Sequence, residues 1–117
     1  LTAVAYPSYR QYAARAKRNE AKACLLQIAT LQERFYLQNN TYTADMTNLG
    51  FANANNNLTD TRTYVCAVTA ANANTFTATA TYQNADGEAG KCLTFGIDGR
   101  GQKTSAPSAD CWTNLRL

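Results

Sequence analysis

A long stretch without a helix breaker, from Pro7 to Asn39, constrains the fold of this 117-residue chain more than any other feature. Within it, apolar side chains recur at steps of three and four, the spacing of one helix face: Ala21, Cys24, Leu25, Ile28, Leu31 and Phe35. Gln32 and Glu33 lie off this stripe, and Asn39-Asn40 is a suitable stop because Asn tolerates the left-handed conformation. The pattern predicts one long helix whose second half packs on a core.

The first half of this helix, within "AYPSYRQYAARAKRNEA" (5–21), has little apolar bulk and lacks a capping residue. Its bases would oppose the helix dipole if the helix began at Pro7, and would be harmless if it continued upstream of Leu1. We therefore expect an N-terminally truncated helix, with a frayed start as the alternative. Residues 7–18 should project or pack against something outside this chain. Tyr6, Tyr9 and Tyr12 are either packing residues or the edge of a membrane-interface belt.

After a connecting region with an Asn-rich loop (40–61), the apolar period changes from helical spacing to two. Runs at 62–69, 74–82 and 91–97 alternate as half-buried strands do, and Leu93, Phe95 and Ile97 share one face. "DGRG" (98–101) predicts a tight turn, and the tail from 102 has little pattern. We predict one α+β domain over 1–117: helix 1–39, connecting loop 40–61, antiparallel sheet 62–97 of three to four strands, and C-terminal loop region 98–117.

The four cysteines, at positions 24, 66, 92 and 111, are too far apart for a CxxC redox pair or a zinc knuckle. Their even number predicts two disulfides and an oxidising compartment, with four free thiols as the alternative. Three connectivities are open. We favour Cys92–Cys111 with Cys24–Cys66, because these loops do not nest.

Composition and charge argue against several classes of function. The chain has no histidine, the commonest general base and metal ligand. Residues 1–39 hold a net charge of +4 and residues 40–117 a net charge of −1, so no domain-wide basic face for nucleic acid is evident. "DGEAGK" (86–91) lacks the Walker spacing, and Asp86, Glu88 and Asp98 lack the EF-hand spacing. We expect no enzyme, no catalytic residue, no metal, no cofactor and no small-molecule substrate.

The chain resembles the type IV pilins, most closely the minor pilins of the type IVa class. The residues that carry the resemblance are 5–43, ending in "QERFYLQNNTYT", then "LGF", "KCLTFGIDGRG" and "DCW". The resemblance implies the pilin fold, in which a long helix packs on the sheet and Cys92 and Cys111 bracket a C-terminal loop. It supports the Cys24–Cys66 pairing less firmly.

The resemblance also implies how the chain assembles. A hydrophobic, methylated segment would precede this sequence, anchoring it in the inner membrane and later forming the filament core. Pro7 would mark a helix kink, with Tyr6 and Tyr9 at the edge of the membrane or fibre core. The bases Arg10, Arg15 and Arg18 would lie on the helix surface and face neighbouring subunits.

The leading functional hypothesis is a structural subunit of an extracellular type IV pilus of a Gram-negative bacterium, serving adhesion or motility, with other pilin subunits as partners. The first alternative is a minor pilin that binds DNA for uptake, and DNA or a surface ligand is the further partner considered. Its candidate DNA contacts are Lys91, Arg100, Lys103 and Arg116. The second alternative is a pseudopilin of a type II secretion system, a class that tends to have a calcium site in place of the C-terminal disulfide.

Overall fold

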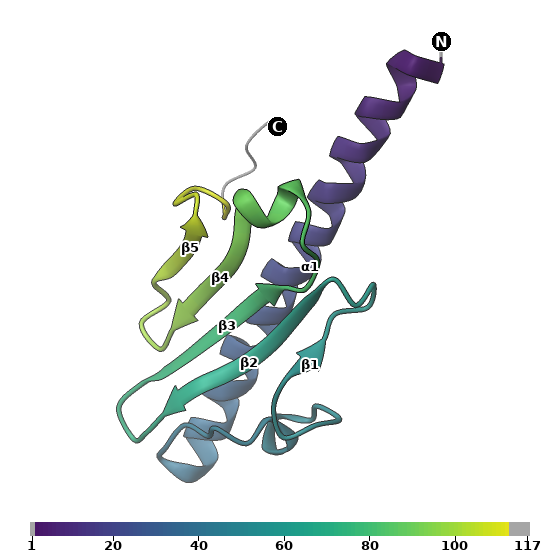
Figure 1. The fold of residues 1–117 in the computed structure, drawn as a ribbon. Coiled ribbons are helices and arrows are strands. Elements are labelled where there is room, and N and C mark those ends of the chain that lie inside the picture. The colour runs from purple at the N-terminus through teal and green to yellow at the C-terminus, as the bar shows by residue number, and fades with distance from the viewer. Residues whose placement is uncertain (1, 113–117) are drawn as a thin grey trace.

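The computed structural model describes residues 2–112, and their side chains from residue 12 onward. One long helix lies across one face of a five-stranded sheet, and its N-terminal part projects beyond the sheet (Figure 1). The strands follow the sequence order β1-β2-β3-β4-β5, and each pair is antiparallel. The elements are α1 (Thr2–Asn39), η1 (Met46–Leu49), β1 (Asn57–Leu58), β2 (Tyr64–Ala71), β3 (Phe76–Tyr82), η2 (Gly87–Gly90), β4 (Cys92–Asp98) and β5 (Lys103–Pro107).

The helix α1 ends at Asn39 because the next residue leaves the right-handed conformation. Asn40 has a φ of 58°, in the left-handed region that Asn tolerates, and its N–H donates to the Tyr36 carbonyl at 2.8 Å. The face of α1 that meets the sheet is formed by Ala21, Leu25 and Ile28, all fully buried. Burial of these side chains holds the helix on the sheet.

Gln32 is an exception to the predicted apolar stripe, because it is fully buried. Its amide nitrogen donates to the Thr43 carbonyl at 2.7 Å, and its amide oxygen accepts from the Thr43 N–H at 3.0 Å. The prediction that Gln32 lies off the buried face was therefore wrong. The amide is tolerated in the core because both of its ends are paired with backbone groups of the following loop.

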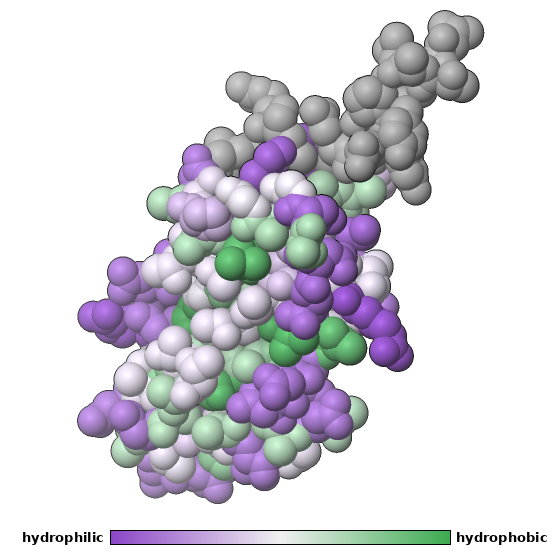
Figure 2. Space-filling model, viewed as in Figure 1, coloured by the Kyte–Doolittle hydropathy of each residue, from purple (hydrophilic) through white to green (hydrophobic). Residues whose placement is uncertain are grey.

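The inner face of the sheet follows the predicted alternation in β2 and β3. The side chains that face α1 are Tyr64, Cys66 and Val68 in β2 and Phe76, Ala78, Ala80 and Tyr82 in β3. The opposite face has threonines at alternate positions of β3. The face viewed in Figure 2 is mostly pale, with strongly hydrophilic residues gathered at its margins. The outer face of the sheet therefore presents residues of intermediate hydropathy with some hydrophobic ones among them, and its most hydrophilic residues lie toward its margins.

The sheet differs from the prediction at both edges and within β4. It has five strands instead of three or four, because β1 lies in the predicted connecting region and β5 in the predicted C-terminal loop. Leu93 is 37% exposed and does not share a face with Phe95 and Ile97. The β4–β5 register shifts between Cys92 and Thr94, which turns the intervening side chain outward.

Candidate functional site

The C-terminal loop is closed by a disulfide between Cys92, the first residue of β4, and Cys111. Their Cα atoms are 5.9 Å apart. The second disulfide joins Cys24 of α1 to Cys66 of β2 and thereby fastens the helix to the sheet. Both pairings are the ones favoured from the sequence, and no free cysteine occurs among the described residues. An oxidising compartment accordingly suits the chain.

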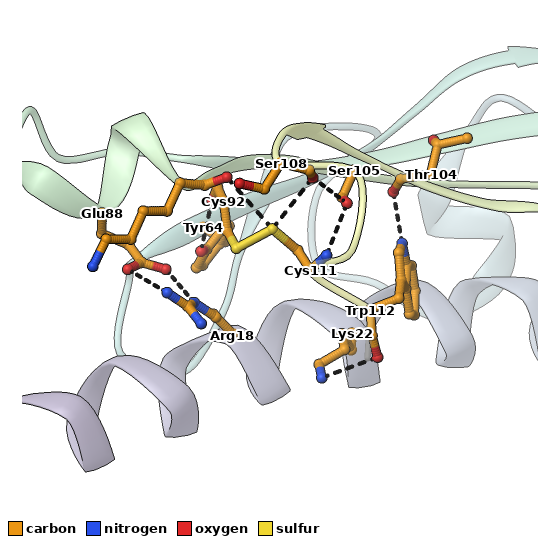
Figure 3. Close-up of a disulfide and its surroundings, with 11 residues drawn as sticks. Arg18, Lys22, Tyr64, Glu88, Cys92, Thr104, Ser105, Ser108, Cys111 and Trp112 are labelled. Carbon is orange, nitrogen blue, oxygen red and sulfur yellow. Dashed lines mark hydrogen bonds and ion pairs between the residues drawn. A yellow bond between two sulfur atoms is a disulfide. The ribbon is translucent and has the colours of Figure 1, made fainter. Parts of the chain in front are cut away.

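Hydrogen bonds fix the chain inside this loop (Figure 3). The Ser105 hydroxyl donates to the Ser108 carbonyl at 2.6 Å and accepts from the Cys111 N–H at 3.1 Å. The Trp112 indole N–H donates to the Thr104 carbonyl at 2.6 Å. The segment after β5 therefore folds back along β5 and occupies part of its open edge.

A buried ion pair connects α1 to η2, just before β4. The Arg18 guanidinium donates from Nε and Nη2 to the two carboxylate oxygens of Glu88, with Nη2···Oε1 at 2.8 Å, as Figure 3 shows. The hydrogen bond to Glu88 raises the pKa of Arg18, against the opposing effect of burial, so the group stays charged. Tyr64 lies nearby, and burial raises the pKa of its phenol, which donates to the Cys92 carbonyl at 3.0 Å.

Arg18 corrects one expectation about subunit assembly. Only 7% of the residue is exposed and its guanidinium is engaged by Glu88, so Arg18 does not lie on the helix surface as expected. Arg15, one turn earlier, is exposed as predicted. The side chains of Tyr6, Pro7, Tyr9 and Arg10 lie outside the described residues, and the kink at Pro7 stays a prediction.

Three of the four candidate DNA contacts can be placed in the structure, and all three are exposed. Lys103 begins β5, where it pairs with Ile97, and Arg100 lies in the turn before it. Lys91 precedes β4 at the opposite end of the β4–β5 pair. Arg100 contacts the Asp98 carboxylate at 3.5 Å, which partly compensates its charge. Arg116 lies outside the described residues.

Two residues at this site were not singled out from the sequence as ligand contacts. Trp112 entered only as part of the "DCW" motif, yet its ring lies 5.5 Å from the Lys103 ammonium. Lys22 donates from Nζ to the Trp112 carbonyl at 3.4 Å, and burial followed by the charge of Arg18 lowers the pKa of Lys22. Position 22 lies ninety residues before 112, so no local pattern could have paired them.

Within residues 2–112 no group of three His, Cys, Asp or Glu side chains is arranged to hold a metal ion. No helix among the described residues is both long and apolar enough to cross a membrane.

Comparison with protein families matches residues 7–96 to the family described as "Type IV minor pilin ComP, DNA uptake sequence receptor". The match spans more than half of the 117 residues. The chain belongs to this family. The resemblance to type IV minor pilins is thereby confirmed, and with it the assignment of the chain as a structural subunit of the type IV pilus.

Among solved structures, the chain is similar to a type IV pilin from Shewanella oneidensis, with a TM-score of 0.58 and 23% sequence identity. The similarity covers 86% of this chain and 99% of that one. At this identity it concerns the fold alone, and it confirms the predicted pilin fold. A search of curated proteins found no match. The Cys92–Cys111 bridge also favours a pilin over the pseudopilin alternative, which was expected to lack it.

Proposed function

We propose that this minor pilin binds DNA for uptake as a subunit of an extracellular type IV pilus. The observation that carries the proposal is the match of residues 7–96 to a family whose description names a DNA uptake sequence receptor. We further propose that the subunit joins other pilins through a hydrophobic segment N-terminal to this sequence, anchored in the inner membrane before assembly. The chain performs no catalysis in this role.

The charges around the C-terminal loop support DNA as the ligand. Lys91 lies at one end of the β4–β5 pair, and Arg100 and Lys103 at the other. At about 3.3 Å per residue, the two ends are roughly 20 Å apart. Measured along the duplex axis, that length spans about six base pairs, because each strand advances about 3.4 Å of axis per nucleotide. Cations at the two ends of the β4–β5 pair can thus reach phosphates of the same duplex.

Two of the acids near this loop, Glu88 and Asp98, are paired with arginines, which reduces their effect on the neighbouring lysines. Glu88 is neutralised by Arg18 from the helix, so it contributes little negative potential near Lys91. Asp98 faces Arg100, which leaves Lys91 and Lys103 as the stronger phosphate contacts. We therefore assign Lys91 and Lys103 as the principal contacts and Arg100 as a weaker one.

A binding titration with a dye-labelled DNA duplex at 50 mM and 200 mM salt tests the proposal by fluorescence anisotropy. We expect binding that weakens steeply with salt, because each phosphate contact releases counterions. The double variant Lys91→Ala/Lys103→Ala should lower the magnitude of the slope of log K against log salt by about 2, roughly one per phosphate contact.

The matched control removes two exposed bases outside the loop, Arg34→Ala and Arg62→Asn. Asn is chosen at position 62 because Arg62 has a φ of 61°, which Asn tolerates. The control should keep the salt slope of the unaltered protein. No binding at micromolar protein in low salt would reject the proposed function, and an equal effect of both double variants would reject the assigned contacts.

A further inference from the structure

Trp112 is the only tryptophan of the chain, and it lies directly after the disulfide that closes the C-terminal loop. It is half-buried, at the open edge of β5. It lies outside residues 7–96, over which the family match extends. Its position beside Lys103 raises the question of what an indole ring does among the cations of the proposed DNA contact.

Four contacts hold this ring in one orientation. The indole N–H donates to the Thr104 carbonyl at 2.6 Å, and the backbone carbonyl of Trp112 accepts from Lys22 Nζ at 3.4 Å. Its ring meets Phe95 edge-to-face, with centroids 5.7 Å apart and planes at 83°. The disulfide at Cys111 restrains the preceding residue. A ring fixed in this way loses little conformational entropy when a ligand packs on it.

These contacts use the polar end of the indole, and the half-buried residue keeps part of its surface exposed. With the N–H already paired, the ring offers an apolar π surface and no free donor. The group next to that surface is the Lys103 ammonium, 5.5 Å from the ring centroid. A cation–π contact at an exposed site is weak, so Lys103 can leave the ring for a phosphate at little cost. An aromatic ring next to a cation is a combination that proteins binding single-stranded nucleic acid use.

We propose that Trp112 is a stacking platform for an unpaired DNA base, with Lys103 contacting an adjacent phosphate. The inference rests on the proposed function, in that DNA is the ligand. It adds that single strands and frayed duplex ends bind through a residue that intact duplex does not use. Bases inside a duplex already stack on one another, so their faces are closed to a fixed ring.

Because Trp112 is the sole tryptophan, the emission excited at wavelengths that tyrosine does not absorb reports on this ring alone. Titration with a twelve-nucleotide oligothymidine should quench that emission to saturation, whereas a blunt twelve-base-pair duplex should quench it far less. Trp112→Ala should weaken oligothymidine binding by about tenfold, within the range measured for loss of one base–aromatic stack. Duplex binding by the same variant should change less than about twofold, since phosphate contacts dominate it.

Trp112→Phe retains a smaller ring and should bind the oligothymidine with intermediate affinity, which separates stacking from a general loss of structure. Lys103→Ala should preserve the quenching and lower the magnitude of the salt slope by about 1. Oligothymidine binding without a change in emission, or with equal affinity in Trp112→Ala, would overturn the inference and leave the duplex proposal intact. Binding of duplex alone would do the same. If neither DNA binds, the proposed function fails and the stacking role fails with it.

Discussion

Two buried polar side chains, Arg18 and Gln32, lie near the two ends of the face that α1 presents to the sheet. Each has a partner from outside the helix: Glu88 in η2 for the first, and the backbone of Thr43 for the second. Both positions continue the spacing of Ala21, Leu25 and Ile28 in steps of three and four, so the helical period alone places them on the buried face. The partners that make a polar side chain tolerable there could not be predicted, because only the folded chain brings them near.

The Gln32 amide satisfies two backbone groups, and its removal should be costly. Gln32→Ala leaves the buried N–H and C=O of Thr43 without their partner, at about 1–3 kcal/mol for each group that water does not reach. We expect the free energy of unfolding, measured in urea, to fall by about 2–4 kcal/mol. Gln38→Ala, at an exposed position of the same helix, should change it by less than about 0.5 kcal/mol. A similar loss in both variants would contradict this role.

Removing only one partner of the Arg18–Glu88 pair should lower the free energy of unfolding. Glu88→Gln leaves a buried guanidinium without its counter-charge, and deprotonation offers no escape because an arginine side chain stays charged in proteins. With side chains only 8% and 12% exposed, we expect a loss of about 3 kcal/mol of unfolding free energy in urea.

The double variant Arg18→Met/Glu88→Leu should recover most of that stability, because two apolar groups of similar size need no counter-charge. Asp60→Asn, at an exposed carboxylate, serves as the single-charge control. The role assigned to the ion pair would be wrong if Glu88→Gln behaved like this control.

At the level of elements, α1 and β3 were predictable because their burial follows a local period. The alternation Phe76, Ala78, Ala80, Tyr82 is visible in the sequence, and these residues are the ones buried. The strand β5 was not predictable, because "KTSAP" lacks apolar alternation and includes a proline. Its place is set by pairing with β4 and by the Trp112 contact to Thr104, neither of which has a local signature.

The disulfide between α1 and β2 should contribute more to stability than the one closing the C-terminal loop. The separations are 42 and 19 residues, so constraint of the unfolded chain predicts about 4 kcal/mol for Cys24–Cys66 and about 3 kcal/mol for Cys92–Cys111. Urea unfolding of Cys24→Ala/Cys66→Ala and of Cys92→Ala/Cys111→Ala measures both. A larger loss in the second variant would show that native contacts of the loop outweigh chain entropy.

The stability of the fold should depend on pH in the acid range, because the Asp98 carboxylate holds the turn between β4 and β5. Its carboxylate accepts from the Gln102 N–H at 2.9 Å and the Arg100 N–H at 3.0 Å, and these bonds, that of Gln102 foremost, lower the pKa of Asp98. Because the pKa of Asp98 is lower in the folded chain than in the unfolded chain, the ionised carboxylate stabilises the fold at pH values above the unfolded-state pKa, near pH 4. This stabilisation is lost as the pH falls through the folded-state pKa.

Asp98→Asn should therefore be less stable than the unaltered protein at pH 7, and the difference should narrow below about pH 4. Thermal unfolding followed by circular dichroism from pH 2 to pH 7 measures this. Asp60→Asn should show no such convergence. A difference that stayed constant across the range would mean that the charge of Asp98 does not hold the turn.

At the scale of the whole molecule, one part of α1 packs on the sheet and its N-terminal part projects beyond it, as Figure 1 shows. The positive excess of the chain lies in residues 1–39, at +4, but Arg18 is compensated internally by Glu88. Arg15, on the projecting side, is exposed. In a filament built from this subunit, Arg15 is therefore the described helix arginine best placed to meet acidic groups of a neighbour.

Arg15→Glu in the full-length protein should reduce incorporation of the subunit into pili. Charge pairs at the rim of an interface mainly set register and rate of association, and each contributes about 0.2–1 kcal/mol, so reversal should lower incorporation by roughly two- to tenfold. The measurement is the amount of subunit in sheared filaments relative to the membrane fraction. The melting temperature should be unchanged, because the side chain is exposed. As the control, Arg34→Glu makes the same charge change at an exposed position on the sheet-bound half of the helix. If the two variants were incorporated equally, the assignment of Arg15 to the assembly surface would be wrong.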